Sequence, residues 1–264
     1  MEYPFPPIEF DVPREDEHGR YALVAGVGPS DTRATPYEQV LSAFENLEHR
    51  LRACGMDFSD VVRTWLYGAD MLDWYGELNR ARRDFFDARG VHDRLLPAST
   101  GIGWSSGTEA KIVMGAFAVR GKQPGAVETE ALPSPLQCPA TSYGSCFSRA
   151  VEVRTPSWRR VIVSGTASIE PGSGEVAHAG DIAAQIDCTL RAVSAIYESR
   201  GLALSDMTGA LVYLKDESYR TDWEAWLERH PEFPRAHSRA IVADICRDEW
   251  LFELESDALA EVKR

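Results

Sequence analysis

The segment from Arg235 to Glu255, RAHSRAIVADICRDEWLFELE, contains the pattern on which the assignment of the fold depends. Its last six residues alternate in polarity as a β-strand does, so Glu253 and Glu255 should share one face. Phe252 and Leu254 should then fill the other face. A solvated strand face is the commoner explanation for two such carboxylates. A functional site is the alternative, and an earlier part of the chain bears on the choice.

The two halves of the chain share residues in the same order. Val24-Ala25-Gly26 recurs as Val163-Ser164-Gly165. Six further residues recur 146 positions later: Gln39, Gly55, Ser59, Asp60, Tyr67 and Asp70 become Gln185, Gly201, Ser205, Asp206, Tyr213 and Asp216. This order indicates an internal duplication of two similar α/β modules. Residues 96–116 correspond to the opening segment, and they keep its apolar alternation but lack Arg239 and both glutamates of the strand.

Secondary-structure signals recur in the same order in both halves. Apolar or β-branched runs predict strands at residues 21–27, 61–67, 111–119, 160–169 and 210–214. Helices are predicted from Thr35-Pro36, around residues 75–86, after Asp181, and around Trp223 and Trp226. A segment rich in proline and glycine separates the halves. We therefore expect an N-terminal arm at 1–20, modules at 21–120 and 147–264, and a connector at 121–146.

Composition argues against several classes of function. The 264 residues have a net charge of −13 without a basic stripe, which disfavours nucleic acid as a partner. No apolar run is long enough for a membrane span, and the polar, proline-rich start is unlike a secretion signal. Five scattered cysteines are typical of a reducing cytoplasm. The six histidines have no metal-ligand spacing, so we expect neither a metal nor a cofactor.

These repeated motifs resemble the reactive-intermediate deaminase family, the Rid or YjgF-like proteins, over about residues 21–120 and 147–260. The resemblance implies an α/β (α+β) fold of two tandem modules, each a mixed sheet backed by two helices as in chorismate-mutase-like folds. It also implies a ligand cleft between neighbouring modules and a homo-oligomer, most simply a trimer.

The resemblance also implies site residues. In the family, an arginine pairs with the substrate carboxylate and a glutamate holds the attacking water; these positions fall on Arg239 and Glu253, with Glu255 a weaker candidate. Their counterparts 140 positions earlier are Ser99 and Val113, so the first module is degenerate. Guanidinium suits a carboxylate anchor, and a strand glutamate can exchange a proton with an sp² carbon. The alternative is that the arginine and glutamate only form a structural ion pair.

The motifs are also similar to those of the chorismatases, a branch of this family that hydrolyses chorismate and releases pyruvate. The similar segments are Ser99–Gly103, Phe147–Ala150, Ser164–Ile169 and Cys246–Glu249. The resemblance makes Glu253 the general acid that protonates the enol ether, and Arg149 and Arg239 the holders of two carboxylates. It places Cys246, Ser99, Thr100, Phe147, Gly165 and Ala167 at the substrate. A small core residue explains Cys246 at least as well as a nucleophile does.

The chain departs from both patterns. It has Tyr143-Gly144-Ser145-Cys146 where chorismatases have Tyr-Gly-Pro-Arg, and Phe147 where simple Rid deaminases have a tyrosine. Three functions therefore stay open. The first is a chorismatase-like hydrolase of an unsaturated carboxylate, and the second is an imine or enamine deaminase in a biosynthetic pathway. The third is a non-catalytic small-molecule binder or scaffold.

Overall fold

The computed structural model describes residues 13–262 and contains two six-stranded sheets. The elements of the first half are β1 (Arg14–Glu15), β2 (Gly19–Val27), α1 (Pro36–Ala53), β3 (Val61–Gly68), α2 (Tyr75–Ala88), β4 (Ala98–Gly103) and β5 (Ile112–Gly121). Those that follow are β6 (Glu128–Leu132), β7 (Ala150–Arg154), β8 (Trp158–Ala167), α3 (Ile182–Glu198), β9 (Met207–Leu214), α4 (Arg220–Arg229), β10 (Ser238–Val242), β11 (Asp244–Ile245) and β12 (Phe252–Glu261).

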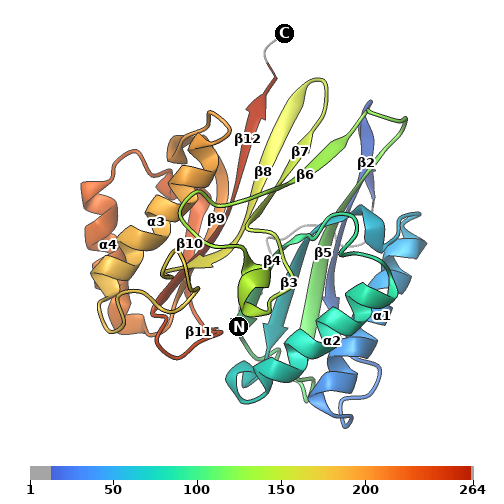
Figure 1. Cartoon of the computed structure of the whole chain (residues 1–264), viewed down its shortest axis with the longest axis horizontal. Helices are drawn as coiled ribbons and strands as arrows, with labels where there is room; N and C mark the ends of the chain where they lie inside the picture. Colours follow the sequence, from blue (N-terminus) through green and yellow to red (C-terminus); the bar gives the residue numbers. More distant parts are fainter. Residues whose placement is uncertain (1–12, 263–264) are drawn as a thin grey trace.

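The sheets lie side by side, and each has two helices on its outer face (Figure 1). The strand orders are β1-β2-β5-β3-β4-β11 and β10-β9-β12-β8-β7-β6. Both sheets are mixed, because β3 runs parallel to β4 and β9 runs parallel to β10 while the other pairs are antiparallel. The expected α+β fold of two tandem modules is therefore confirmed.

Local signals in the sequence set the starts of the long helices. The Thr35 side chain caps α1 by accepting from the backbone N–H of Glu38, and the Glu38 carboxylate accepts from the backbone of Thr35 at 2.9 Å. Asp181 caps α3 by accepting from the N–H of Ala184 at 3.0 Å. Such caps satisfy backbone donors that the first helical turn leaves open. Both helices then pack an apolar stripe on their sheet.

The repeated glutamines make equivalent hydrogen bonds in both modules. Gln39 accepts a hydrogen bond from the backbone N–H of Lys111 at 2.9 Å, just before β5. Gln185 accepts one from Leu251 at 2.8 Å, just before β12. Each glutamine thus ties a helix to the last long strand of its own sheet. This equivalence gives a physical basis for the duplication seen in the sequence.

The two modules also share an interior. The hydroxyls of Tyr67 and Tyr213, which occupy equivalent positions 146 residues apart, lie 3.4 Å from each other in this buried layer. The chain crosses between the sheets as well, because β11 pairs with β4 although it follows β10 in sequence. The modules are consequently joined by packing and by backbone pairing.

The segments outside the expected modules contribute to both sheets. The expected connector at 121–146 contains β6, which pairs with β7 at the edge of the second sheet. Of the expected arm, residues 13–20 contain β1 and the start of β2, whereas residues 1–12 lie outside the described part of the chain.

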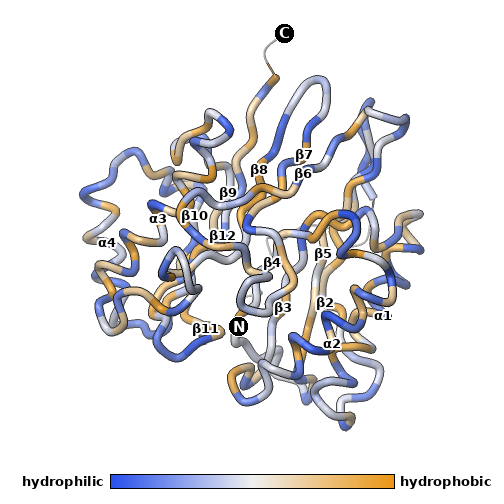
Figure 2. The backbone as a smooth tube through the Cα atoms, viewed as in Figure 1, coloured by the Kyte–Doolittle hydropathy of each residue, from blue (hydrophilic) through white to orange (hydrophobic). Residues whose placement is uncertain are grey.

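Hydrophobic residues concentrate in the strands, and hydrophilic residues concentrate in the loops and the outer turns of the helices (Figure 2). Within residues 13–262, no helix is both long and apolar enough to cross a bilayer. The same residues contain no group of three or more histidine, cysteine or acidic side chains arranged to hold a metal ion.

Candidate active site

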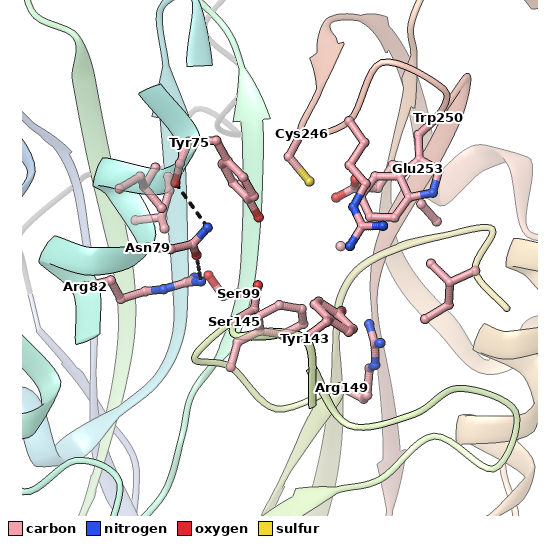
Figure 3. Close-up of a pocket in the computed structure, with 18 residues that line it drawn as sticks. Tyr75, Asn79, Arg82, Ser99, Tyr143, Ser145, Arg149, Cys246, Trp250 and Glu253 are labelled. Atoms are coloured by element: carbon pink, nitrogen blue, oxygen red, sulfur yellow. Dashed lines mark hydrogen bonds between the residues drawn. The ribbon is translucent and has the colours of Figure 1, made fainter. Parts of the chain in front are cut away.

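A cavity of about 300 Å³ lies between the two modules. Figure 3 shows Tyr75, Asn79 and Arg82 of α2 on one wall, and Trp250 and Glu253 on the opposite wall. The segment between the two modules and the start of the second module close the remaining side. The volume of the cavity is at the lower end of the range for small-molecule sites.

Glu253 enters the cavity from β12, the strand that alternates in polarity. Phe252 and Leu254 are buried in the core of the second module, so Glu253 and Glu255 point to the opposite face as expected. Gly165 on β8 makes room for the carboxyl, because a Cβ at this position would overlap Oε1 of Glu253. The backbone N–H of Gly165 donates to Oγ1 of Thr100 at 3.0 Å, which fixes the glycine against the first module.

The environment of Glu253 favours its protonated form. Burial raises the pKa of this carboxyl to about 8, the neighbouring Glu255 adds to the rise, and Arg149 opposes it. At neutral pH the group is therefore mainly a carboxylic acid. A buried acid with a pKa close to the working pH is well suited to proton donation.

Glu255 is held by a separate structural network beneath the cavity. It accepts a hydrogen bond from Nε1 of Trp65 at 2.9 Å and pairs with the guanidinium of Arg63 at 2.8 Å. Arg63 is only 2% exposed, so this ion pair is almost completely removed from water. Glu255 is therefore held by two side chains of β3, Trp65 and Arg63.

Three arginines give the cavity a cationic lining. Arg149 is fixed by two hydrogen bonds, from Nε and Nη2, to the carbonyl of Cys138 at 3.0 and 2.9 Å. Arg247 donates to the carbonyl of Gly174 at 2.9 Å and lies over the ring of Trp250. Arg82 comes from α2. Within the described residues none of the three has a carboxylate partner within 4.0 Å, so the cavity favours an anionic ligand.

Cys246 forms part of the wall and is not a reactive nucleophile. Burial raises the pKa of its thiol to about 12, and the nearby Glu253 adds to the rise. The group is therefore a neutral thiol at physiological pH, whereas nucleophilic cysteines are thiolates. Of the two interpretations of Cys246, the geometry favours a small side chain that shapes the cavity beside Tyr75.

Similarity to known proteins covers most of the chain. A family model described as endoribonuclease L-PSP, the domain of YjgF/Rid proteins, matches residues 15–105. A chorismatase of Streptomyces rapamycinicus is 29% identical over 95% of this chain and 74% of the relative, and one of Streptomyces hygroscopicus is 28% identical over 93% and 70%. A crystal structure of chorismatase has a TM-score of 0.70 at 20% identity and covers 93% of this chain and 76% of that chain.

The chain is thus similar to the YjgF/Rid domain over residues 15–105 and to chorismatases over most of its length. The cavity brings together Glu253 and six of the eight residues expected at the substrate, namely Arg149, Cys246, Ser99, Phe147, Gly165 and Ala167. Thr100 lies just behind the wall, where it is buried and accepts from Gly165. Whether these residues bind a substrate remains a proposal.

Arg239 differs from the expectation, because it does not line the cavity with Glu253. It is exposed on β10, and it pairs in register with Leu211 of β9, which in turn pairs with Glu255 of β12. Two strand spacings, roughly 10 Å, separate Arg239 from that glutamate. The expected pairing of the arginine and the glutamate within one cleft therefore needs correction.

The reason is that the cleft combines positions from different modules. The counterpart of Arg239 in the first module is Ser99 on β4, and Ser99 does line the cavity with Glu253. The arginine position of one module thus faces the glutamate position of the next. With two modules in the chain, the cavity receives the first module's serine, while Arg239 lies on the far edge of the second sheet.

The sequence patterns did not point to seven polar or aromatic residues of the cavity. Four of them are Tyr143, Ser145, Arg247 and Trp250, and the other three, Tyr75, Asn79 and Arg82, belong to α2. The α2 residues carried a usable signal. Together with Leu78 they follow the helical spacing i, i+3, i+4, i+7, so they share the face that packs inward. An arginine and an asparagine on such a stripe indicate a polar site beside a core.

Proposed function

We propose that this protein is a chorismatase-like hydrolase. Its substrate would be chorismate or a related enol ether that carries carboxylates, and pyruvate would be released. The observation that supports this chemistry most directly is Glu253, a buried carboxyl whose pKa is raised to about 8 in a cavity lined by arginines. The similarity to two chorismatases over more than nine-tenths of the chain supports the substrate class.

The proposed reaction starts with proton transfer from Glu253 to the terminal methylene carbon of the enol ether. A C–H bond forms, and positive charge develops on the ether carbon and its oxygen. The carboxylate left on Glu253 is stabilised by Arg149, which lowers its pKa. Water then adds to the cationic carbon and returns a proton to Glu253, and the hemiketal collapses to pyruvate and the ring alcohol.

The deaminase alternative places a different demand on the same residue. A glutamate that holds an attacking water as a hydrogen-bond acceptor works best when it is ionised. Burial keeps Glu253 protonated at neutral pH, and this supports the acid role over the water-holding role. A non-catalytic binder of anions would need the cationic lining of the cavity but no acid.

The deciding experiment is incubation of the purified protein with chorismate, with pyruvate followed through lactate dehydrogenase. Glu253→Gln should lower kcat by roughly 10²- to 10⁴-fold, since the amide keeps the shape but has no acidic proton. Arg80→Met, an exposed change on α2, is the control that should keep full activity. Pyruvate release from chorismate that is unaffected by Glu253→Gln would refute the role. Ammonia release from 2-aminoacrylate without pyruvate release from chorismate would favour the deaminase.

We also propose a cytoplasmic protein of secondary metabolism that forms a homo-oligomer, with a trimer the simplest form. The five cysteines are all free thiols, which suits a reducing compartment. The Rid superfamily builds clefts between modules, and the outer edge of β10 has no strand partner among the described residues. Light scattering coupled to size-exclusion chromatography measures the mass in solution, and a monomer would contradict the assembly.

A further inference from the structure

Arg82 is a buried cation whose bonding capacity is largely unused. It projects from α2 into the cavity (Figure 3), and only 3% of the residue is exposed. Its Nη2 donates to Oδ1 of Asn79 at 2.6 Å, whereas its Nε is buried without a hydrogen-bond partner among the described residues. A buried guanidinium without a carboxylate is unfavourable unless a ligand supplies the missing charge.

Asn79 holds the guanidinium in one orientation. Its side-chain nitrogen donates to the backbone carbonyl of Tyr75 at 3.1 Å, so its oxygen is turned toward Arg82. Both residues lie one turn apart on the face of α2 that lines the cavity. The arginine is therefore positioned before any ligand binds, which reduces the entropy lost on binding.

Arg82 of the first module and Arg149 of the second both lie beside the ring of Phe147. The guanidinium carbon of Arg82 is 5.9 Å from the centre of the Phe147 ring, and that of Arg149 is 5.6 Å from it. Glu253 and Arg149 both lie on the second module's side of the cavity, across from Arg82 (Figure 3). A substrate that places its reacting group at Glu253 would thus direct its neighbouring carboxylate to Arg149 and its far end to Arg82.

We propose that Arg82, oriented by Asn79, binds the second carboxylate of the substrate and makes the site selective for dianions. The carboxylate bound here is the one on the ring, remote from the enol ether. This assignment of ends rests on the proposed hydrolase function. The module that lost its own arginine and glutamate would in this way supply a specificity-determining residue to its neighbour's acid.

Three stable aromatic compounds test the assignment. One is the dianion 3-(carboxymethoxy)benzoate, which has both carboxylates. The others are 3-methoxybenzoate, which has only the ring carboxylate, and phenoxyacetate, which has only the side-chain carboxylate. Calorimetric titration of the wild-type protein should show tighter binding of the dianion than of either monoanion.

Arg82→Met should weaken binding of the dianion and of 3-methoxybenzoate by about 10- to 100-fold, as for loss of a hydrogen bond to a charged group. Binding of phenoxyacetate should stay unchanged. Arg80→Met removes the same charge from the exposed side of α2, where Arg80 lies over Tyr37, and should leave all three affinities unchanged. Equal loss for all three compounds, or no loss for any, would overturn the proposal.

Two further measurements keep the proposal open to refutation. If Arg82→Met does not fold, the wild-type comparison decides alone, and a dianion that binds no tighter than both monoanions overturns the inference. Turnover of chorismate is a separate readout. Absence of pyruvate release together with Arg82-dependent binding would refute the hydrolase function but retain the anion site. Pyruvate release at the wild-type rate in Arg82→Met would retain the hydrolase function but refute the role of Arg82.

Discussion

Replacement of Gly165 by alanine should displace the carboxyl of Glu253. A Cβ at position 165 would overlap Oε1 of Glu253 and would come within 3.0 Å of Cγ2 of Thr100. The backbone of Gly165 is not in the left-handed region, so the added side chain is opposed by contact and not by strain of φ. The strand cannot easily shift, because Glu253 pairs in register with Ala167 only two residues away.

The size of the effect follows from this contact. An added methyl in a packed site costs about 1–3 kcal/mol of unfolding free energy, and a reacting group moved by about 1 Å can lose roughly 100-fold in rate. Gly165→Ala should therefore lower kcat for chorismate by about 100-fold. It should lower stability by about 1–3 kcal/mol in urea unfolding monitored by tryptophan fluorescence.

Two variants separate this mechanism from general damage to the sheet. Gly209→Ala lies on β9 with no atom within 4 Å of its added Cβ, so it should leave stability and kcat near wild type. In a Glu253→Ala background, the overlapping carboxyl is gone, and Gly165→Ala should then have little effect on stability. An active, stable Gly165→Ala protein would refute the placement of the Glu253 carboxyl over Gly165.

Three other predictions follow from the buried ionisable groups. The kcat for chorismate should fall as pH rises through about 8, because the raised pKa of Glu253 leaves the proton donor present only below that pH; a pH profile that is flat to pH 10 would contradict the acid role. Arg63→Met should cost about 3–5 kcal/mol in urea unfolding, because it leaves Glu255 buried without its ion-pair partner at 2.8 Å; wild-type stability would show that the pair is dispensable. Iodoacetamide at pH 8 should leave Cys246 unmodified in the folded protein, since burial raises the pKa of its thiol to about 12, and mass spectrometry after brief labelling would detect a reactive thiol.

Local and repeated signals in the sequence were sufficient for the fold. The cap at Thr35 and the alternation around Glu253 depend on neighbours a few residues away, and the structure confirms both. The duplication could be recognised because Gln39 and Gln185 make equivalent hydrogen bonds to the backbone in the two modules. These bonds explain why a glutamine stands at the same position in both. Signals of this kind can be interpreted without knowing how the two modules pack against each other.

The composition of the site depended on information that the sequence does not contain. Arg239 and Glu253 belong to the same module and match one family pattern, yet the cavity takes its arginine position from the other module. The hydrophobic periodicity within a module does not indicate which neighbouring module supplies the other wall of its cleft. Arg82 is a different case. The helical spacing of α2 indicates that this arginine faces inward, but it does not indicate that the arginine lines a cavity.

The role of the first module changes as a result. Loss of the arginine and glutamate at Ser99 and Val113 suggests a module kept only for structure. Its helix α2 nevertheless supplies Arg82 and Asn79 to the cavity, opposite the acid of the second module. Duplication allows such division, because each copy needs to keep only the half of the cleft that it contributes.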